Sequence, residues 1–244
     1  MLCPTELRAR DIGRAALAAL SPGEPARVFA AFERSCYVET RAGIACIGGA
    51  ALGRGPLNVI VDDGAMIPPI GSRVKLVLDD ASLWTPAAQA QSSCAAPARL
   101  ISEFFSRWSA NRLAQAFLEW LAGGARLPAP RAADALIGLG PGLTPAGDDF
   151  VGGAMIALRA FGRDPLADRV AAWALPLAES RTGRISRAHL RCAALGEGHE
   201  ALHRLLSALN DGESAVARAL DALARVGHTS GLDAAAGALL APAD

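Results

Sequence analysis

The chain has 244 residues, of which 52% are hydrophobic, 5% aromatic and 20% charged. Its 24 Lys and Arg balance its 24 Asp and Glu, with nine of each sign before residue 96 and fifteen of each after it. This composition supports a sizeable core and excludes extended disorder, and the neutral charge gives no reason to expect nucleic acid or an anionic membrane as a partner.

The N-terminal part predicts a leading helix followed by short strands. Apolar residues recur with helical spacing over 5–20, and a Ser-Pro-Gly sequence then ends the run. Brief runs rich in Val, Ile, Tyr and Phe follow, separated by Gly, Pro and Asp. We expect strands at 27–33, 36–41, 44–48, 57–61 and 73–78, which together favour a small antiparallel sheet or barrel.

The C-terminal part predicts only helices. One long amphipathic element covers 100–121 and ends at Gly123 and Gly124. Later helices are expected at 148–161, 166–179, 186–195, 199–209, 214–226 and 232–240. The fold class is therefore α+β, with a β-rich domain at 1–85, a linker poor in bulky apolar residues at 86–98, and a helical domain at 99–244.

Cysteine usage and the absence of long apolar runs indicate a cytoplasmic protein. The five cysteines form an odd set without a C-x-x-C pair, which suits a reducing compartment better than a disulfide framework. The N-terminus lacks the pattern of a signal peptide, and no stretch reaches the roughly 18 apolar residues of a membrane span. Three cysteines alternate with apolar neighbours, as core residues do, and we assign none a catalytic role: Cys36, Cys46 and Cys192.

The segment GLGPGLTPAGDDFVGG, residues 138–153, carries the strongest functional signal. A Gly-rich turn that leads into a helix exposes N–H groups and the positive end of the helix dipole, and both favour a bound anion. The segment matches neither the P-loop nor a strand-linked G-x-G-x-x-G pattern, so it does not indicate a nucleotide site. The expected substrate-binding residues here are Gly140, Gly142, Thr144 and Gly147.

Two adjacent aspartates, Asp148 and Asp149, stand where the helix is expected to begin. A purely structural interpretation makes Asp148 the N-cap and places Asp149 in the first turn. The functional interpretation gives both a catalytic role, in which they orient an amide or carbamoyl N–H or hold Mg²⁺ with phosphate; we favour the first.

Two further polar loops precede predicted helices. GHTSGLD at 227–233 supplies His228, Thr229 and Ser230, and RTGRIS at 181–186 supplies Arg184 and Ser186. Helix caps and a solvated arginine are the structural alternatives. If the helix bundle brings the three loops to one rim, they form a donor-rich site for a small anion, with His228 the candidate for proton transfer.

The sequence HEALH at 199–203 satisfies the H-E-x-x-H pattern of zinc enzymes. Two nearby glycines place His199 at the frayed start of a helix, and no extended metalloprotease pattern follows. We therefore favour surface or capping histidines and predict neither a metal nor another cofactor.

Three segments resemble the oxamate carbamoyltransferase subunit AllH-like family of bacterial proteins: GLGPGLTPAGDDF, the TGRIS segment, and GHTSGLD with the AAAGALL that follows it. A weaker similarity lies in GRGPLNVIVDD at 53–63, so the resemblance extends over most of the chain. Family members usually have Ser at the positions of Ala146 and Thr229; the first change removes a hydroxyl, and the second keeps one.

The resemblance implies a part in anaerobic allantoin degradation, a branch of purine catabolism. There an enzyme of several subunits splits oxalurate with phosphate into oxamate and carbamoyl phosphate. It implies a carbamoyltransferase component whose ligand is a small anion, namely a carboxylate, carbamoyl phosphate or phosphate, and whose partners are other enzyme subunits. A noncatalytic subunit that binds a small carboxylate or acts as a scaffold is the alternative.

Overall fold

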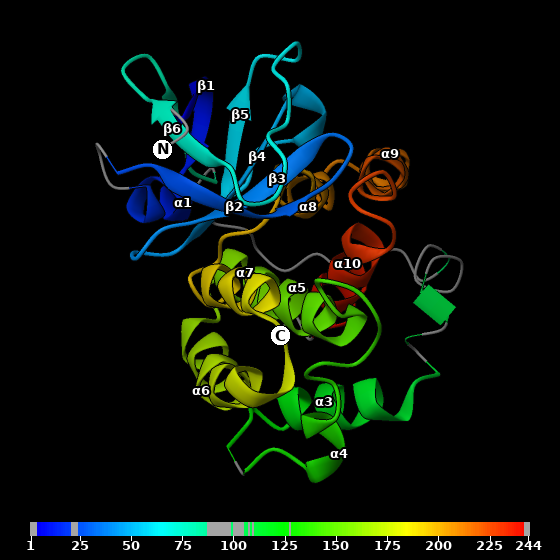
Figure 1. Cartoon of the computed structure of the whole chain (residues 1–244). Helices are drawn as coiled ribbons and strands as arrows, with labels where there is room; N and C mark the ends of the chain where they lie inside the picture. The colour runs from blue at the N-terminus through cyan, green and yellow to red at the C-terminus, as the bar shows by residue number, and fades with distance from the viewer. Residues whose placement is uncertain are drawn as a thin grey trace. The chain divides into compact units, whose positions relative to one another are not determined.

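The structure, a computed structural model, describes residues 4–20, 24–86, 99, 105–106, 108, 110–126 and 128–241. Within them the chain is α+β, as the sequence predicts, with strands in its first part and helices dominating the second (Figure 1). Residue contacts divide it into two compact units, Met1–Pro86 and Ala87–Asp244. All but the first residue of the predicted linker at 86–98 lies outside the described residues.

The first unit is a six-stranded β-barrel with one additional strand. The strand order is β5-β4-β3-β2-β6-β1, a pairing between β1 and β5 closes the barrel, and β7 pairs with β1. The strands are β1 (Thr5–Gly13), β2 (Ala26–Ala31), β3 (Ser35–Glu39), β4 (Ile44–Gly48), β5 (Asn58–Val61), β6 (Arg73–Val77) and β7 (Ser82–Trp84). Small and β-branched side chains fill the interior, among them Val28, Val38, Ile47 and Val59.

One sequence prediction is wrong in this unit. The segment 5–20 is strand β1 followed by the short helix α1 (Arg14–Ala19), rather than one helix. Leu7 and Ala9 are buried while Arg8 between them is exposed, so an alternation of period two governs the start of this segment. Of the two predicted architectures, antiparallel sheet or barrel, the barrel is confirmed, and it includes the parallel pairs of β1 with β6 and of β4 with β5.

The second unit is helical. Its helices are α3 (Arg112–Ala122), α4 (Arg131–Asp134), α5 (Ala146–Ala160), α6 (Asp164–Arg181), α7 (Arg184–Ala194), α8 (Glu200–Ala208), α9 (Glu213–Leu223) and α10 (Ser230–Leu240). The six helices expected between 148 and 240 therefore correspond to α5 through α10. None of the helices in the described ranges combines the length and the apolar character that a bilayer crossing requires.

The long element expected over 100–121 is interrupted. Residues 110 and 111 are not helical, and Asn111 begins a new helix, α3, by accepting hydrogen bonds from the backbone N–H groups of Leu113 and Ala114. An Asn side chain at this position satisfies donors that the first helical turn leaves without partners. The short helix α4 was not expected from the sequence.

Helix α5 is the centre of the second unit and contacts α6, α7, α8 and α10 (Figure 1). Its closest neighbour is α10, because both helices carry glycine at their crossing. A Cβ atom on Gly153 would lie 1.9 Å from the carbonyl oxygen of Ala234, and one on Gly237 would lie 1.8 Å from that of Phe150. Only glycine permits this approach of two backbones, which brings the first turns of α5 and α10 together.

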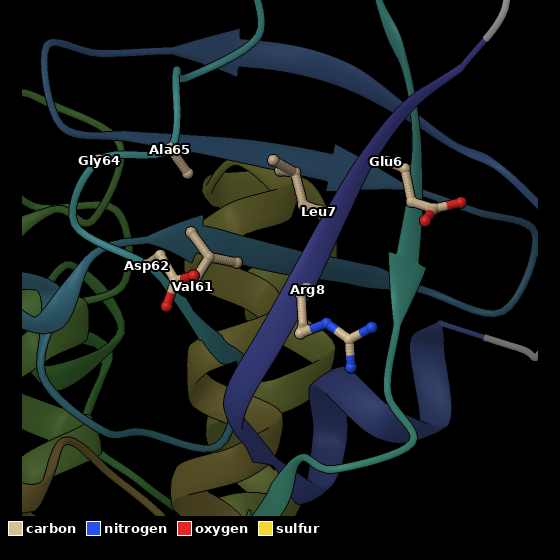
Figure 2. Close-up of a pocket in the computed structure, with 7 residues that line it drawn as sticks. All are labelled: Glu6, Leu7, Arg8, Val61, Asp62, Gly64 and Ala65. Carbon is tan, nitrogen blue, oxygen red and sulfur yellow. The ribbon is translucent and has the colours of Figure 1, made fainter.

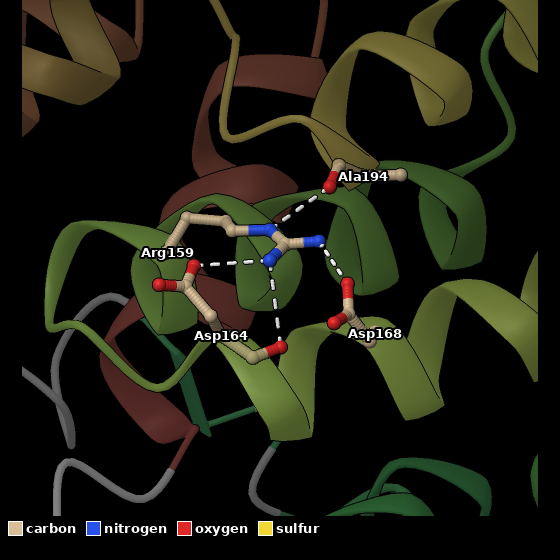
Figure 3. A network of polar contacts seen from close by, with 4 residues as sticks. All are labelled: Arg159, Asp164, Asp168 and Ala194. Carbon is tan, nitrogen blue, oxygen red and sulfur yellow. Dashed lines mark hydrogen bonds and ion pairs between the residues drawn. The ribbon is translucent and has the colours of Figure 1, made fainter.

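The other end of α5 is fixed by Arg159 (Figure 3). Its Nε donates to the carbonyl oxygen of Ala194, at the end of α7, at 3.0 Å. Its two terminal nitrogens bind the carboxylates of Asp164 and Asp168 in the first turns of α6. One guanidinium thus joins the C-terminal end of α5 to α6 and α7 through a planar set of donors.

Candidate functional site

The loop before α5 explains most of the glycine density in 138–153. Gly138, Gly140 and Gly142 all adopt left-handed backbone conformations, with φ of 82°, 109° and 101°. At Gly138 a Cβ atom would also lie 2.3 Å from the carbonyl oxygen of Arg181. The loop therefore needs glycine to turn tightly and to approach the end of α6.

The first turn of α5 is not the open set of N–H donors that the sequence suggested. The helix begins at Ala146 after an N-cap at Pro145. The N–H of Gly147 donates to the carbonyl oxygen of Leu139 at 2.9 Å, and that of Asp148 donates to the carbonyl oxygen of Pro145 at 2.9 Å. Because the helix begins two residues before Asp148, Asp148 is not its N-cap. The N–H groups of Gly147 and Asp148 are used within the protein and do not form an open site for an anion.

Asp148 connects three segments of the second unit. The residue is 2% exposed. Its Oδ1 accepts the backbone N–H of Gly138 at 2.8 Å, and its Oδ2 accepts the hydroxyl of Ser186 at 2.6 Å. Both predicted site residues, Asp148 and Ser186, are therefore brought together, but their hydrogen-bonding capacity is spent on holding the Gly-rich loop and the start of α7 against α5.

Asp149 lies beside hydroxyl groups from two other segments. The Oγ1 of Thr144 and the Oγ of Ser230 are 2.9 Å apart, and both side chains hydrogen-bond the Asp149 carboxyl. Its Oδ2 atom, however, is buried and has no hydrogen-bond partner among the described residues. A buried carboxyl oxygen without a partner is rare in folded proteins and points to a group that a ligand or a water molecule would complete.

Burial raises the pKa of Asp149 well above its ordinary value of 3.8. The negative charges of Asp233 and Asp148 raise the pKa further, while the hydrogen bonds from Ser230 and Thr144 lower it. Desolvation disfavours the charged form of a carboxyl, and so do neighbouring carboxylates. The pKa of Asp149 is thus perturbed in the manner common to functional carboxyls.

Asp233 and Trp108 complete this part of the site, and sequence reasoning gave neither a role. Asp233 is 1% exposed, and its Oδ1 accepts the indole N–H of Trp108 at 2.8 Å. The Trp108 ring stacks on Phe150 with centroids 4.4 Å apart. Asp233 follows Ser230 by three residues on α10, a spacing that puts both on one helix face and could have signalled it. Trp108 gave no such signal, because 125 residues separate it from Asp233.

The remaining predicted site residues lie farther out. His228 and Thr229 are exposed on the turn before α10, and Gly140 and Gly142 are exposed in the loop before α5. Arg184 is exposed at the start of α7. Within the described residues, neither His228 nor Arg184 is among the groups that act on the Asp149 carboxyl. The structure therefore collects Thr144, Asp148, Asp149, Ser186 and Ser230 around the starts of α5, α7 and α10, where Gly147 is also buried. It leaves Gly140, Gly142, Arg184, His228 and Thr229 at the surface.

Thr182 carries a second buried oxygen that lacks a partner. Its Oγ1 makes no hydrogen bond within the described residues. Thr182 ends α6, directly after Arg181, whose carbonyl oxygen lies against Gly138. With Oδ2 of Asp149 and Oδ2 of Asp233, three buried hydroxyl or carboxyl oxygens of the helical unit make no hydrogen bond within the described residues.

The HEALH segment has the geometry of a helix start. Nδ1 of His199 accepts the N–H of Ala201 at 3.2 Å as the N-cap of α8, and Nε2 of buried His203 accepts the N–H of Gly198 at 3.2 Å. Each imidazole thus uses a lone pair that a zinc ion would need. The capping role of His199 is confirmed, and a surface position for His203 is wrong. In the described ranges no group of three or more His, Cys, Asp or Glu has an arrangement suited to a metal ion.

Histidines beside this helix start are held neutral. Burial, together with the nearby His199, lowers the pKa of both His189 and His203 from 6.5 to about 4. Desolvation penalises the imidazolium form because its charge has left water. These histidines are therefore structural groups that stay uncharged at neutral pH.

The cysteines are poorly suited to nucleophilic chemistry. Cys36, Cys46 and Cys192 are buried thiols. Burial raises the pKa of Cys36 to about 11 and that of Cys46 to about 12. The reactive form of cysteine is the thiolate, so these two barrel residues are almost entirely unreactive at neutral pH.

The first unit contains a hollow of about 470 Å³ at one edge of β1 (Figure 2). It is lined by residues 6–8 of β1 and by 61, 62, 64 and 65 around the end of β5. Two of its charged residues are in exposed ion pairs, Arg8 with Asp80 and Asp62 with Arg10. Such pairs at the surface are ordinary, so the hollow offers no chemistry comparable to that of Asp149.

Taken together, the fold and site define a two-unit α+β protein with a carboxyl and hydroxyl site where two helices of its second unit begin. Residues 136–242 match the model of the family described as oxamate carbamoyltransferase subunit AllH. The chain is AllH-like over this helical stretch, and the match confirms the resemblance that its glycine-rich and GHTSGLD segments indicated. The weaker similarity at 53–63 lies outside the matched residues. No curated protein and no solved structure matches the chain.

Proposed function

We propose that this chain is a subunit of a carbamoyltransferase and that its helical unit binds a small carboxylate or carbamoyl compound beside Asp149. Oxamate, oxalurate and carbamoyl phosphate are the ligands we favour. The family description supports the class of enzyme. The observation that carries the proposal is the Asp149 Oδ2 atom, which is buried and lacks a partner among the described residues.

Several groups around Asp149 suit such a ligand. The hydroxyls of Thr144 and Ser230 lie next to the carboxyl, and hydroxyls both donate and accept hydrogen bonds. A carbamoyl group presents N–H donors and a carbonyl acceptor, so the free Asp149 oxygen has a matching atom in either protonation state. Asp148 and Ser186 act as positioning residues, because both are occupied in holding the loop before α5.

The exposed residues are proposed to form the rim of this site. His228 precedes Ser230 by two residues on an exposed turn, and an imidazole is the side chain best suited to proton transfer near neutral pH. Arg184 supplies positive charge at the start of α7 for a carboxylate or phosphate. Thr229 and the backbone of Gly140 and Gly142 complete the proposed contacts, whereas the N–H of Gly147 is used by Leu139.

A noncatalytic subunit that binds a small carboxylate is the alternative. It is favoured by the full internal use of the Asp148 carboxyl and the Ser186 hydroxyl, which leaves this pair no freedom to react with a substrate. In both versions we propose other enzyme subunits as partners, consistent with the subunit named in the family description. We place the protein in the cytoplasm, where its buried cysteines would remain thiols.

Calorimetric titration with oxamate, oxalurate, carbamoyl phosphate and inorganic phosphate tests the binding site. We expect the wild-type chain to bind at least one of the first three compounds and Asp149→Ala to lose at least tenfold in affinity. Asp221→Ala removes an exposed aspartate from α9 and is the matched control, with affinity unchanged. Failure of the wild-type chain to bind any of these compounds, alone or with its partner subunits, would refute the proposal.

An assay of phosphate-dependent oxalurate cleavage distinguishes the two versions. A catalytic subunit loses product formation in Asp149→Ala and His228→Ala when the partner subunits are present. A noncatalytic subunit retains the turnover rate at saturating substrate in both variants.

A further inference from the structure

An anionic ligand beside Asp149 raises an electrostatic problem. Asp148 and Asp149 on α5 and Asp233 on α10 place three carboxyls around the first turns of two helices, and the charges of Asp148 and Asp233 act on Asp149. An ionised carboxylate in contact with a carboxylate or phosphate ligand would repel it strongly, because burial removes the screening by water. One of the carboxyls next to the ligand must therefore be neutral.

Hydrogen bonding distinguishes the three groups. Asp148 accepts from the N–H of Gly138 at one oxygen and from the hydroxyl of Ser186 at the other. Asp233 accepts the indole N–H of Trp108 at Oδ1 at 2.8 Å, while its Oδ2, like that of Asp149, makes no hydrogen bond among the described residues. Asp148 and Asp233 are therefore each bound by at least one N–H group, which can only donate and needs an acceptor oxygen.

Asp149 is differently placed. The groups that face it are Thr144 from the preceding loop, Ser230 and Asp233 from α10, and Asp148 on its own helix. None of these is a cation or an N–H donor, and the two hydroxyls can accept as well as donate. The Oδ2 of Asp149 receives no hydrogen bond within the described residues. A proton on Oδ2 would remove the charge and also turn the unmatched acceptor into a donor.

We propose that Asp149 binds the ligand as a neutral carboxylic acid, with Oδ2–H donating to a carboxylate or carbonyl oxygen, and that Asp233, fixed by Trp108, is the positioning residue that keeps this proton in place. The inference rests on the proposed function, since it assigns the polarity of the same site. The raised pKa of Asp149, caused first by burial and then by the charges of Asp233 and Asp148, agrees with it. The site therefore selects ligands that present an oxygen acceptor rather than a cationic group.

The pH dependence of oxamate binding by the full chain tests this assignment. Oxamate carries its carboxylate charge from about pH 5 to about pH 9, so the titrating group belongs to the protein. We expect affinity to fall about tenfold per pH unit above the pKa of Asp149. Asp149→Asn, whose amide N–H replaces the acid O–H, is expected to bind with an affinity that no longer depends on pH. His228→Ala is measured alongside, because imidazoles ordinarily titrate in this range. Loss of the pH dependence in this variant would assign the titrating group to His228 and overturn the proposal.

Asp233→Asn tests the positioning role. The Asn oxygen can still accept the Trp108 N–H, but the negative charge beside Asp149 is gone, so we expect the binding profile to move to lower pH. A purely structural role for Asp233 would change affinity at every pH and leave the midpoint in place, which would overturn this part of the proposal. Near-ultraviolet circular dichroism, which reports the packing of Trp108, verifies that both Asn variants are folded.

Two results would overturn the assignment to Asp149. Wild-type affinity that rises with pH would show an ionised acceptor, as would loss of binding in Asp149→Asn at all pH values. In both cases oxamate still binds the wild-type chain, and the proposed function stands without this inference. Absence of wild-type binding to every compound tested would instead refute the proposed function itself.

Discussion

The helical unit of this protein buries carboxyl groups, whereas no Asp or Glu among the described residues of the barrel unit is buried. In the barrel, Asp80 and Asp62 pair with arginines, and all four side chains are more than half exposed. In the helical unit, Asp148 and Asp233 are 2% and 1% exposed and accept hydrogen bonds from buried donors. Exposed pairs contribute little to stability because water screens them, whereas a buried carboxylate depends on each of its partners. Burial, rather than the number of charges, therefore distinguishes the carboxyls of the candidate site from those of the barrel.

Individual glycines of the two units can be compared in a similar way. Gly64, in a barrel loop, has open space where a Cβ atom would stand. Gly153 and Gly237 lie against backbone atoms of the neighbouring helix at distances that no side chain can share. The same residue type thus provides a loop in one unit and the closest helix contact in the other.

The largest expected effect follows from this second contrast. Gly237→Ala would force the Cβ atom into the carbonyl oxygen of Phe150, so α10 must move away from α5. We expect a loss of about 2 to 3 kcal/mol in the free energy of unfolding, the usual range for overpacking. Three of the four tryptophans lie in the helical unit, so urea unfolding followed by tryptophan fluorescence measures the change. Gly64→Ala is the control, and equal losses in both variants would remove the contrast between the units.

Removing a buried carboxyl should cause the second-largest loss in the free energy of unfolding. Asp148→Ala leaves the N–H of Gly138 and the hydroxyl of Ser186 without an acceptor, and we expect a loss of about 2 kcal/mol in the free energy of unfolding. Asp80→Ala breaks the exposed pair with Arg8 and should change stability by less than about 0.5 kcal/mol. Urea unfolding followed by far-ultraviolet circular dichroism compares the two variants. A comparable loss in both would show that burial does not decide the role of these aspartates.

The order of the elements could be predicted from the sequence because it depends on local patterns. Short β-branched runs between turn residues gave five of the strands, and apolar spacing gave α5 through α10. The segment at 5–20 misled because Leu7, Ile12 and Ala16 fit helical spacing, while the pairing of β1 with β5, β6 and β7 decides its conformation. Such pairings join residues far apart in the sequence, and no local pattern records them.

The contacts around Asp149 in the candidate site, like the order of the elements, could be predicted only in part. Thr144, Asp149 and Ser230 stand in polar loops at helix starts, and the structure brings them into contact as the sequence suggested. The use of the Gly147 N–H by Leu139 could not be foreseen, because it depends on the path of the glycine-rich loop. The bond between Trp108 and Asp233 depends on the packing of remote helices, and a buried indole N–H seeks whichever acceptor the fold supplies.

A third test concerns acid sensitivity, which should belong to the helical unit because all four histidines lie in it. The pKa of His203 is lowered from 6.5 to about 4, so the unfolded chain binds more protons than the folded chain between these values. Stability is therefore full above about pH 6.5 and falls as the pH drops toward about 4. His203→Gln keeps an acceptor for the N–H of Gly198 but does not titrate.

Thermal unfolding of His203→Gln and the wild-type chain between about pH 7 and pH 4 measures this difference. We expect the variant to lose less stability than the wild-type chain over that interval, with His189 responsible for part of the remaining loss. Identical pH profiles for the two proteins would show that His203 is not buried in its neutral form.

The smallest effect we expect is a gain in stability at Asp149. Its pKa is raised in the folded chain, so the folded state binds more protons than the unfolded state above the ordinary aspartate value. The stability that this group contributes is present below that value and is lost as the pH rises through the raised pKa. Asp149→Asn cannot ionise, and its amide can supply the donor that the Oδ2 position lacks. The variant should therefore melt at a slightly higher temperature than the wild-type chain at about pH 8, and the difference should shrink toward about pH 4.

Asp148→Asn is the matched control on the same helix turn. The amide N–H₂ of the new Asn would face the N–H of Gly138 or the hydroxyl of Ser186. Because two donors would then face each other, Asp148→Asn should lower the melting temperature. If the melting temperature falls in Asp148→Asn and rises in Asp149→Asn, then Asp148 stabilises the fold and Asp149 destabilises it. A group that is kept for binding is expected to destabilise the fold in this way. A fall in melting temperature for Asp149→Asn at alkaline pH would instead place Asp149 with Asp148 as a structural carboxylate and remove the reason to treat it as the centre of the site.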